Sequence, residues 1–161
     1  MAHFLSNELP DDLYRKLEGN DLEACAEKVI LICTVDAHGW PHPAMLSYFE
    51  VIAKDRCNIR LATSKSSRTT ENMRRNGKLT VLIIDERAAY YIKGHVEELA
   101  EAMNCSPLNS KLNLRVEQVL SDDANQQFEA GAYVAGGITY KNPNLAAERQ
   151  KAKEILRELL E

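Results

Sequence analysis

The sequence predicts a mostly β fold, a small antiparallel barrel with helices at both ends of a single domain. Short apolar or alternating segments follow one another in meander order, with turn residues between them. Helical patterns are expected only near the two termini and in one insertion between strands. At 161 residues and 18.1 kDa the chain is long enough to bury a core, and residues 1–161 are expected to form one domain. This combination favours a small antiparallel barrel.

Two helical segments are expected before the first strand. Residues 10–19, PDDLYRKLEG, carry acids in the first turn and Arg15 and Lys16 in the last, and Gly19 suits a helix stop. A second helical segment is expected around residues 21–28, DLEACAEK. These are the N-terminal helices of the predicted domain.

The body of the chain is expected to form a series of strands. The segment DAHG at residues 36–39 predicts a tight turn, because Asp and Gly tolerate the backbone angles of a reversal. KDRC at residues 54–57 is expected to form a second turn, and Gly94 predicts a bulge. Apolar or alternating patterns place the strands at residues 29–35, 43–53, 58–63, 78–85, 88–99 and 113–120.

The stretch between the third and fourth strands combines hydroxyls with positive charge. Residues 66–76 have the length of a short helix that Gly77 would end. A helix N-terminus offers unpaired backbone N–H groups and a positive dipole end, and here it follows directly from a strand. With the nearby hydroxyls and the Arg68 guanidinium, these groups would form a phosphate site. A capped surface helix with solvated charges, Arg74 and Arg75 among them, would explain the same residues, and the local sequence does not decide between the two.

A C-terminal helix closes the chain. Asn142 is expected to cap it, and Pro143 suits the first helical position, where no amide hydrogen is needed. Apolar residues then recur on one face, which predicts packing against the barrel. They are Leu145, Ala152, Leu156 and Leu159.

Composition limits the classes of function. Apolar residues make up 45% and charged residues 27% of the chain, and the net charge is −4 with a pI near 5.6. This balance disfavours a nucleic-acid binder, because no broad cationic face is available. The N-terminal residues do not read as a signal peptide, and the apolar runs are too short to cross a bilayer. We therefore expect a cytoplasmic protein.

A metal site is not predicted. None of the four cysteines is spaced as C-x-x-C, so buried reduced thiols are expected. His38 and His42 have an H-x-x-x-H spacing, which can bind zinc when it lies on a helix. Gly39 and Pro41 fall between them and disfavour a helix, so we interpret both histidines as turn residues.

Three segments within residues 29–99 form a recognisable series: TVDAHGWPHPAMLSYFEV, IRLATSKSSRTTENMRRNGKLTVLII and YYIKGHVEEL. In order and spacing they resemble the pyridoxamine 5'-phosphate oxidase-like family, the FMN-binding split barrels. The family has a T-x-D-x-x-G-x-P hairpin, a strand that ends in Thr or Ser, and an S-R-K-like helix start. The resemblance implies a split β-barrel and a homodimer, with FMN bound at the subunit interface by both chains.

The resemblance also implies which residues hold the FMN phosphate. Ser67 and Arg68 match the family's phosphate-binding serine and arginine. Thr69 occupies a second phosphate-binding position that is often Lys, so one cation is lost, and Lys65 is a candidate replacement. Asn72 lies one helical turn beyond Arg68 and is expected to brace it.

The flavin ring is expected to lie along two strands. In the family, the third strand passes the ring and ribityl chain, and an earlier segment runs along the isoalloxazine. The oxidase proper has an Arg where this chain has Ala44, so a further contact is missing. An apolar slot with a few polar contacts suits such a ring. The expected ring and ribityl contacts are Ala44, Met45, Leu46, Ala62, Thr63 and Ser64.

The resemblance leaves two classes of function open. One is an FMN-dependent oxidoreductase or flavin reductase that acts on a small molecule, with the redox chemistry supplied by the flavin. The other is a non-catalytic module that binds flavin or haem on the same barrel. True pyridoxamine phosphate oxidase activity is not expected, because that enzyme carries a C-terminal Trp and an Arg-x-His pair. The C-terminal residues here, ITYKNPNLAAERQKAKEILRELLE, have neither.

Overall fold

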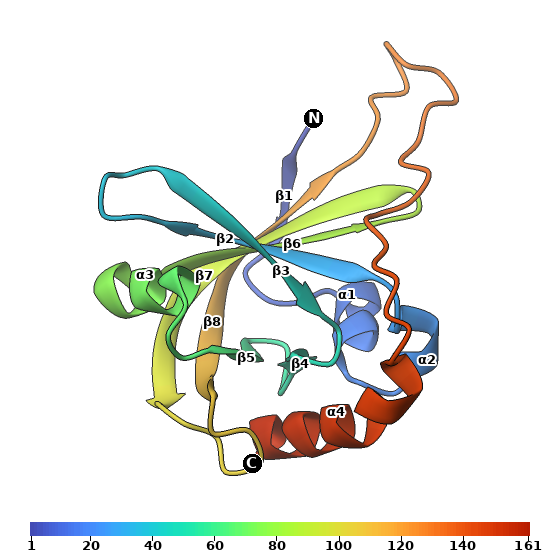
Figure 1. Cartoon of the computed structure of the whole chain (residues 1–161). Helices are drawn as coiled ribbons and strands as arrows, with labels where there is room; N and C mark the ends of the chain where they lie inside the picture. Colours follow the sequence, from blue (N-terminus) through green and yellow to red (C-terminus); the bar gives the residue numbers. More distant parts are fainter.

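The computed structural model describes the backbone of residues 1–161 and every side chain except that of Ala88. The chain forms eight strands and four helices, whose arrangement is shown in Figure 1. The strands are β1 (His3–Ser6), β2 (Val29–Val35), β3 (Pro41–Ser47), β4 (Val51–Ala53), β5 (Asn58–Ser64), β6 (Lys78–Asp85), β7 (Ala88–Ala100) and β8 (Asn109–Asp122). The helices are α1 (Asp11–Leu17), α2 (Leu22–Cys25), α3 (Arg68–Asn76) and α4 (Leu145–Leu160).

All strands belong to one antiparallel sheet that is rolled into a barrel. The strand order is β3-β2-β6-β7-β8-β5-β4, with β1 paired to β8. The two strands at the ends of this path, β3 and β4, are consecutive in the chain and are joined by residues 48–50. A covalent turn, not a ladder of hydrogen bonds, therefore brings the two ends of the sheet together. The predicted split β-barrel is confirmed.

Two apolar clusters stabilise this arrangement. The barrel core lies inside the rolled sheet, where alternate strand residues such as Ile32, Ile59 and Ile92 are fully buried. A second group, the α4 cluster, packs α4 against the other side of β4 and β5. Its members are Ile52, Ala62, Met103, Ile155, Leu156 and Leu159.

The structure corrects the expected second strand. Residues 43–53 form the end of β3 and then β4, separated by a turn. The Glu50 carboxylate accepts hydrogen bonds from the Ser47 backbone N–H at 2.8 Å and from the Ser47 hydroxyl at 2.9 Å. The Glu50 N–H in turn donates to the Ser47 carbonyl at 3.1 Å. These bonds reverse the chain, so the apolar run from Leu46 to Val51 does not continue as one strand.

The C-terminal helix begins later than expected. Its N-cap is Asn144, and Asn142 lies before the helix. The Asn142 side chain accepts a hydrogen bond from the Asn144 N–H at 2.9 Å and donates to Glu148 at 2.7 Å. Asn142 therefore fixes the approach to α4 without capping it, and the predicted cap was wrong by two residues. Most of the predicted apolar face is buried, as expected.

Gly94 forms the predicted bulge. The pairing of β7 with β8 shifts register between Lys93 and Gly94. A Cβ atom at this position would lie only 1.9 Å from the backbone oxygen of Arg115. Glycine is therefore required here by the close approach of two backbones.

None of the helices in the described chain combines the length and the apolar character needed to cross a membrane.

We predict that Gly94→Ala destabilises the fold, because the Arg115 backbone has to move to admit a methyl group. The free energy of unfolding, measured in urea, should fall by about 3 kcal/mol. Gly136→Ala is the control, because no atom lies within 4 Å of its added Cβ. It should stay within about 0.5 kcal/mol of the native protein. Equal losses for the two variants would contradict the close approach.

Candidate functional site

The polar segment between β5 and β6, residues 65–77, contains the predicted helix; we call this segment the joint. The helix α3 begins at Arg68 and has Ser67 as its N-cap, whose hydroxyl accepts a hydrogen bond from the Thr70 N–H at 3.2 Å. Gly77 ends the helix in a left-handed conformation with φ 64° and donates its N–H to the Met73 carbonyl. The predicted helix and its stop are confirmed, with the first turn two residues later than expected.

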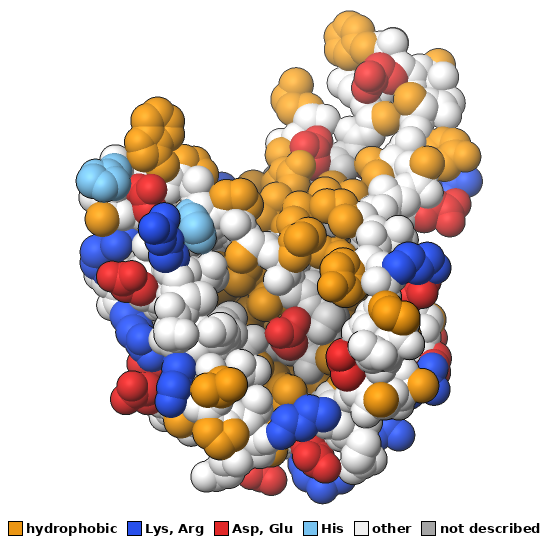
Figure 2. Space-filling view, in the orientation of Figure 1, with side chains coloured by type: hydrophobic (Ala, Val, Ile, Leu, Met, Phe, Trp, Pro, Cys, Tyr) orange, Lys and Arg blue, Asp and Glu red, His pale blue; other side chains and the backbone are white. Residues whose placement is uncertain are grey.

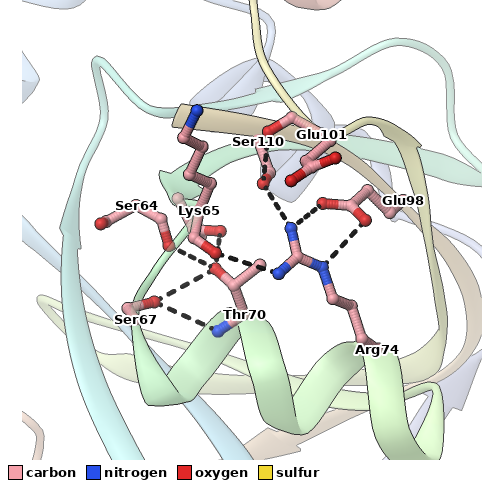
Figure 3. Close-up of polar contacts among 9 residues, drawn as sticks. Ser64, Lys65, Ser67, Thr70, Arg74, Glu98, Glu101 and Ser110 are labelled. Atoms are coloured by element: carbon pink, nitrogen blue, oxygen red, sulfur yellow. Dashed lines mark hydrogen bonds and ion pairs between the residues drawn. The ribbon is translucent and has the colours of Figure 1, made fainter. Parts of the chain in front are cut away.

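A chain of buried hydroxyls fixes the first turn of α3 to the end of β5 (Figure 3). The Thr70 hydroxyl donates to the Ser64 carbonyl at 2.7 Å. Because its hydrogen is used there, it must accept from the Thr63 hydroxyl, which lies 2.7 Å away. The Ser67 hydroxyl lies 3.1 Å from the same Thr70 oxygen. Thr63 and Thr70 are both buried, so water does not compete for these bonds.

Arg74 is part of the structure and is not the solvated charge that we expected. Its guanidinium donates two hydrogen bonds to the Glu98 carboxylate, at 2.9 and 2.5 Å (Figure 3). It also donates to the Lys65 carbonyl at 3.0 Å and to the Ser110 hydroxyl at 3.2 Å. The hydrogen bond from Arg74 lowers the pKa of the Glu98 carboxyl, despite the opposing effect of burial. Arg74 therefore links the joint to β7 and β8.

Arg75 is also engaged, and Asn72 has a different role from the predicted one. The Arg75 guanidinium donates to the Val35 carbonyl at 2.6 Å and to the Asn72 side chain at 3.0 Å. Asn72 is buried and donates to the Thr34 hydroxyl at 3.0 Å. It therefore fastens α3 to β2, and the expectation that it braces Arg68 was wrong.

Positive charge without a partner remains at the start of α3. In the part of the chain that the structure describes, the exposed Arg68 guanidinium makes no hydrogen bond or ion pair, and neither does the Lys65 ammonium group. The backbone N–H groups of Arg68 and Thr69 are the first two of the helix, where no intrahelical acceptor exists. We call this set of donors, from Lys65 and from residues 67–69, the candidate anion site. All members of this set can donate hydrogen bonds, which suits an anion such as a phosphate.

The other predicted cofactor contacts lie in different surroundings. Ala44, Met45 and Leu46 follow one another on β3, an edge strand of the sheet that contacts α3. Met45 is 61% exposed, Ala44 is half-buried, and Leu46 belongs to the barrel core. Ala62 is fully buried in the α4 cluster. Thr63 and Ser64 belong to the hydroxyl chain described above.

Two features of the site region were not foreseen from the sequence. The central role of Thr70 had a local signal, because Ser67 and Thr70 have the spacing of an N-cap and its third helical residue. A cavity of about 550 Å³ beside β3 and α4 had no such signal in the sequence. Among the described residues, no group of three His, Cys, Asp or Glu side chains is placed to hold a metal ion.

We predict that Thr70→Val weakens the fold, because it leaves the buried Thr63 hydroxyl and the Ser64 carbonyl without their partner. The free energy of unfolding should fall by about 1–3 kcal/mol. Thr80→Val is the matched control: Thr80 is half-buried on β6, and its hydroxyl makes no hydrogen bond in the described chain. Urea titrations of both variants measure the difference. If Thr80→Val lost as much stability as Thr70→Val, the hydroxyl chain would not be what holds α3.

Comparisons with known proteins agree with the fold. Residues 22–135 match the family model described as pyridoxamine 5'-phosphate oxidase. The uncharacterized protein YclD of Bacillus subtilis (strain 168) is 32% identical over 118 residues, which cover 73% of this chain and 77% of YclD.

Two solved structures share the architecture. A candidate pyridoxamine 5'-phosphate oxidase from Lactobacillus delbrueckii has a TM-score of 0.58 and 18% identity, covering 74% of this chain and 98% of its own. HupZ of Group A Streptococcus has a TM-score of 0.51 and 18% identity, covering 60% and 90%. At such identities these two structures show the fold alone. The family model and the Bacillus relative go further, and this chain belongs to the pyridoxamine 5'-phosphate oxidase family.

Proposed function

We propose that this protein is an FMN-binding flavoprotein and an oxidoreductase that acts on a small molecule. The observation that carries the proposal is the distribution of positive charge around α3. Two of the helix arginines, Arg74 and Arg75, are used to hold the structure together. Arg68 has no such partner in the described chain, although it lies beside unpaired helix N–H groups. These free donors form the candidate anion site.

An FMN phosphate suits the candidate anion site on chemical grounds. A phosphate oxygen accepts hydrogen bonds from the N–H groups of a helix N-terminus and is stabilised by the positive end of the helix dipole. The Arg68 guanidinium can meet two phosphate oxygens in one planar arrangement. Ser67 is fixed as the N-cap, so its hydroxyl lies at the start of the helix, whereas Thr69, which follows Arg68, is buried. Lys65 adds the charge that Thr69 does not supply.

The flavin ring would extend from this phosphate toward β3. Met45 offers a largely exposed apolar side chain there, and Ala44 and Leu46 are its neighbours on the strand. A ring system of this kind needs apolar contact with few polar groups, which β3 supplies. FMN, when bound, supplies the redox chemistry. This chain would bind and orient the cofactor through α3 and β3 and would shield it from water.

We further propose that the protein is a homodimer. An apolar row runs across the outer face of the sheet, where a barrel strand normally meets water. Strand register places half-buried or exposed side chains of β3, β2, β6, β7, β8 and β1 side by side. We define this outer apolar row by its members Met45, Leu31, Leu82, Tyr91, Leu120 and Phe4.

The surroundings of the row also suit a second copy. Figure 2 shows hydrophobic side chains gathered in a hollow between the β2–β3 hairpin and the segment that follows β8. The two chain segments that border this hollow carry exposed aromatic side chains. Trp40 is 70% exposed in the hairpin, and Phe128 is 84% exposed in the segment after β8. Both would become buried between two subunits that pair through this face. Because Met45 belongs to the row, the flavin ring would then lie close to the subunit interface.

We predict that the protein in solution has twice the mass of the 18.1 kDa chain at micromolar concentration. Leu82→Arg, in the middle of the outer apolar row, should shift the mass measured by light scattering toward the monomer, because it buries an unpaired charge. Glu97→Arg, at an exposed position of β7, should leave the dimer intact. A native protein that is already monomeric would contradict the proposal.

We predict that Arg68→Ala weakens FMN binding by roughly tenfold to a hundredfold, because each charge-assisted hydrogen bond to the phosphate contributes about 1.5–3 kcal/mol. Riboflavin, which lacks the phosphate, should bind poorly to the native protein and respond little to the substitution. The control is Arg157→Ala, since Arg157 is another exposed helix arginine. Fluorescence titrations of both flavins measure these affinities.

Three results would tell against this assignment. FMN affinity unchanged in Arg68→Ala would place the phosphate elsewhere. Equal losses for FMN and riboflavin would show that Arg68 does not contact the phosphate. A Soret band without flavin bands in the purified protein would favour haem binding on the same barrel.

A further inference from the structure

A cavity of about 550 Å³ lies between the end of β3 and the first half of α4. Three separate parts of the chain form it: the start of β2, the turn after β3, and the approach to α4 together with the helix itself. Its size is that of a site for a small organic molecule. Most of its lining is apolar, from Ala26, Val29, Met45, Leu46, Phe49, Tyr140, Leu145, Ala152 and Ile155.

The two cations of the lining are bound to groups within the chain. The Lys28 ammonium lies 3.3 Å from the Asp85 carboxylate, which also pairs with Lys16. Burial alone would raise the pKa of the Asp85 carboxyl, but hydrogen bonds from Lys16, the Glu86 N–H and Lys28 lower it to about 2. Asp85 therefore stays ionised and holds Lys28 near neutral pH. The Lys151 ammonium donates to the Cys105 carbonyl.

The two carboxylates of the lining are likewise engaged. Glu50 accepts both hydrogen bonds from Ser47 that form the turn after β3. Glu148 accepts the 2.7 Å hydrogen bond from the Asn142 side chain. These bonds shape the two ends of the cavity. Every charged lining residue thus has a hydrogen-bond partner in the chain, and Lys28 is also paired with a carboxylate.

What the cavity offers a ligand is apolar surface. Met45 is 61% exposed and Tyr140 is 60% exposed, so their contact area is open to an incoming molecule. An ionised ligand would lose hydration against the apolar part of this lining, whereas a neutral apolar one would gain from leaving water. We propose that this cavity binds a neutral, largely apolar organic molecule. If the flavin lies along β3 as proposed above, Met45 joins the two sites, and such a molecule is the substrate class of the flavoprotein.

A pair of related fluorescent probes tests the charge preference. N-phenylnaphthylamine is neutral, and anilinonaphthalene sulfonate has the same ring system with a negative charge. The native dimer should bind the neutral probe at least tenfold more tightly than the sulfonate. Equal affinities, or tighter binding of the sulfonate, would overturn the proposal. Absence of binding of the neutral probe would do so as well, since a partner subunit that fills the cavity would give that result.

Variants of adjacent residues on α4 locate the binding. Leu145→Trp fills the cavity and should weaken binding of the neutral probe at least tenfold. Ala146→Trp adds the same ring at an exposed position outside the lining and should change the affinity by less than twofold. Leu145→Glu is a second variant that places a charge in the cavity and suits the first turn of a helix, so folding should be retained. Equal affinities in all three variants would show that the probe binds elsewhere.

FMN titrations of the same variants separate this inference from the proposed function. Leu145→Trp and Leu145→Glu should bind FMN as the native protein does, because the phosphate site lies on α3. Selective loss of the neutral probe in a protein that binds no FMN would support the cavity and refute the flavin. Normal FMN binding without selective loss of the probe would refute the cavity alone.

Discussion

The hydrogen bond from the Thr70 hydroxyl to the Ser64 carbonyl is the constraint on which the candidate anion site depends. It joins the last residue of β5 to the first turn of α3, so the helix must begin where the strand ends. The Ser67 cap and the Thr63 hydroxyl meet the same oxygen, and both Thr side chains are buried. A helix start fixed in this way keeps its unpaired N–H groups in one orientation. This preorganisation favours binding of an anion, because little conformational entropy remains to be lost.

The positive charges of α3 fall into two groups, one bonded within the fold and one without a partner in the described chain. Arg74 and Arg75 lie in the last turns of the helix, where their guanidinium groups reach Glu98 and the Val35 carbonyl. Both contacts lead to strands of the barrel and hold the helix against them. Arg68 lies at the other end, where the helix dipole repels a cation. A cation placed there without a partner has an electrostatic cost that a bound phosphate would remove, and our proposal of a phosphate site rests on this asymmetry.

The sequence was a good guide wherever apolar periodicity or a glycine fixes the structure. Alternation of apolar residues placed the strands, and the two glycines at positions 77 and 94 marked a helix stop and a bulge. The prediction that Arg74 and Arg75 are solvated was wrong, because their acceptors Glu98 and Val35 lie 24 and 40 residues away in the chain. The break after β3 was also missed, although its contact is local, because the apolar pattern does not reveal the bond from the Ser47 N–H to the Glu50 side chain. Polar side-chain contacts leave no periodic signal, whether their partners are near or distant in the chain.

Met45 lies where three features of the molecule meet. It stands on the edge strand expected to border the flavin, it begins the outer apolar row, and it lines the cavity beside α4. The Glu50 turn makes this possible, because it ends β3 two residues after Met45 and leaves the strand without a partner on one side. A substitution at Met45 would disturb all three features together, so its effect could not be assigned to any one of them. Arg68, Leu82 and Leu145 each belong to one feature only, so the proposed phosphate site, the proposed subunit interface and the cavity are separable at those positions.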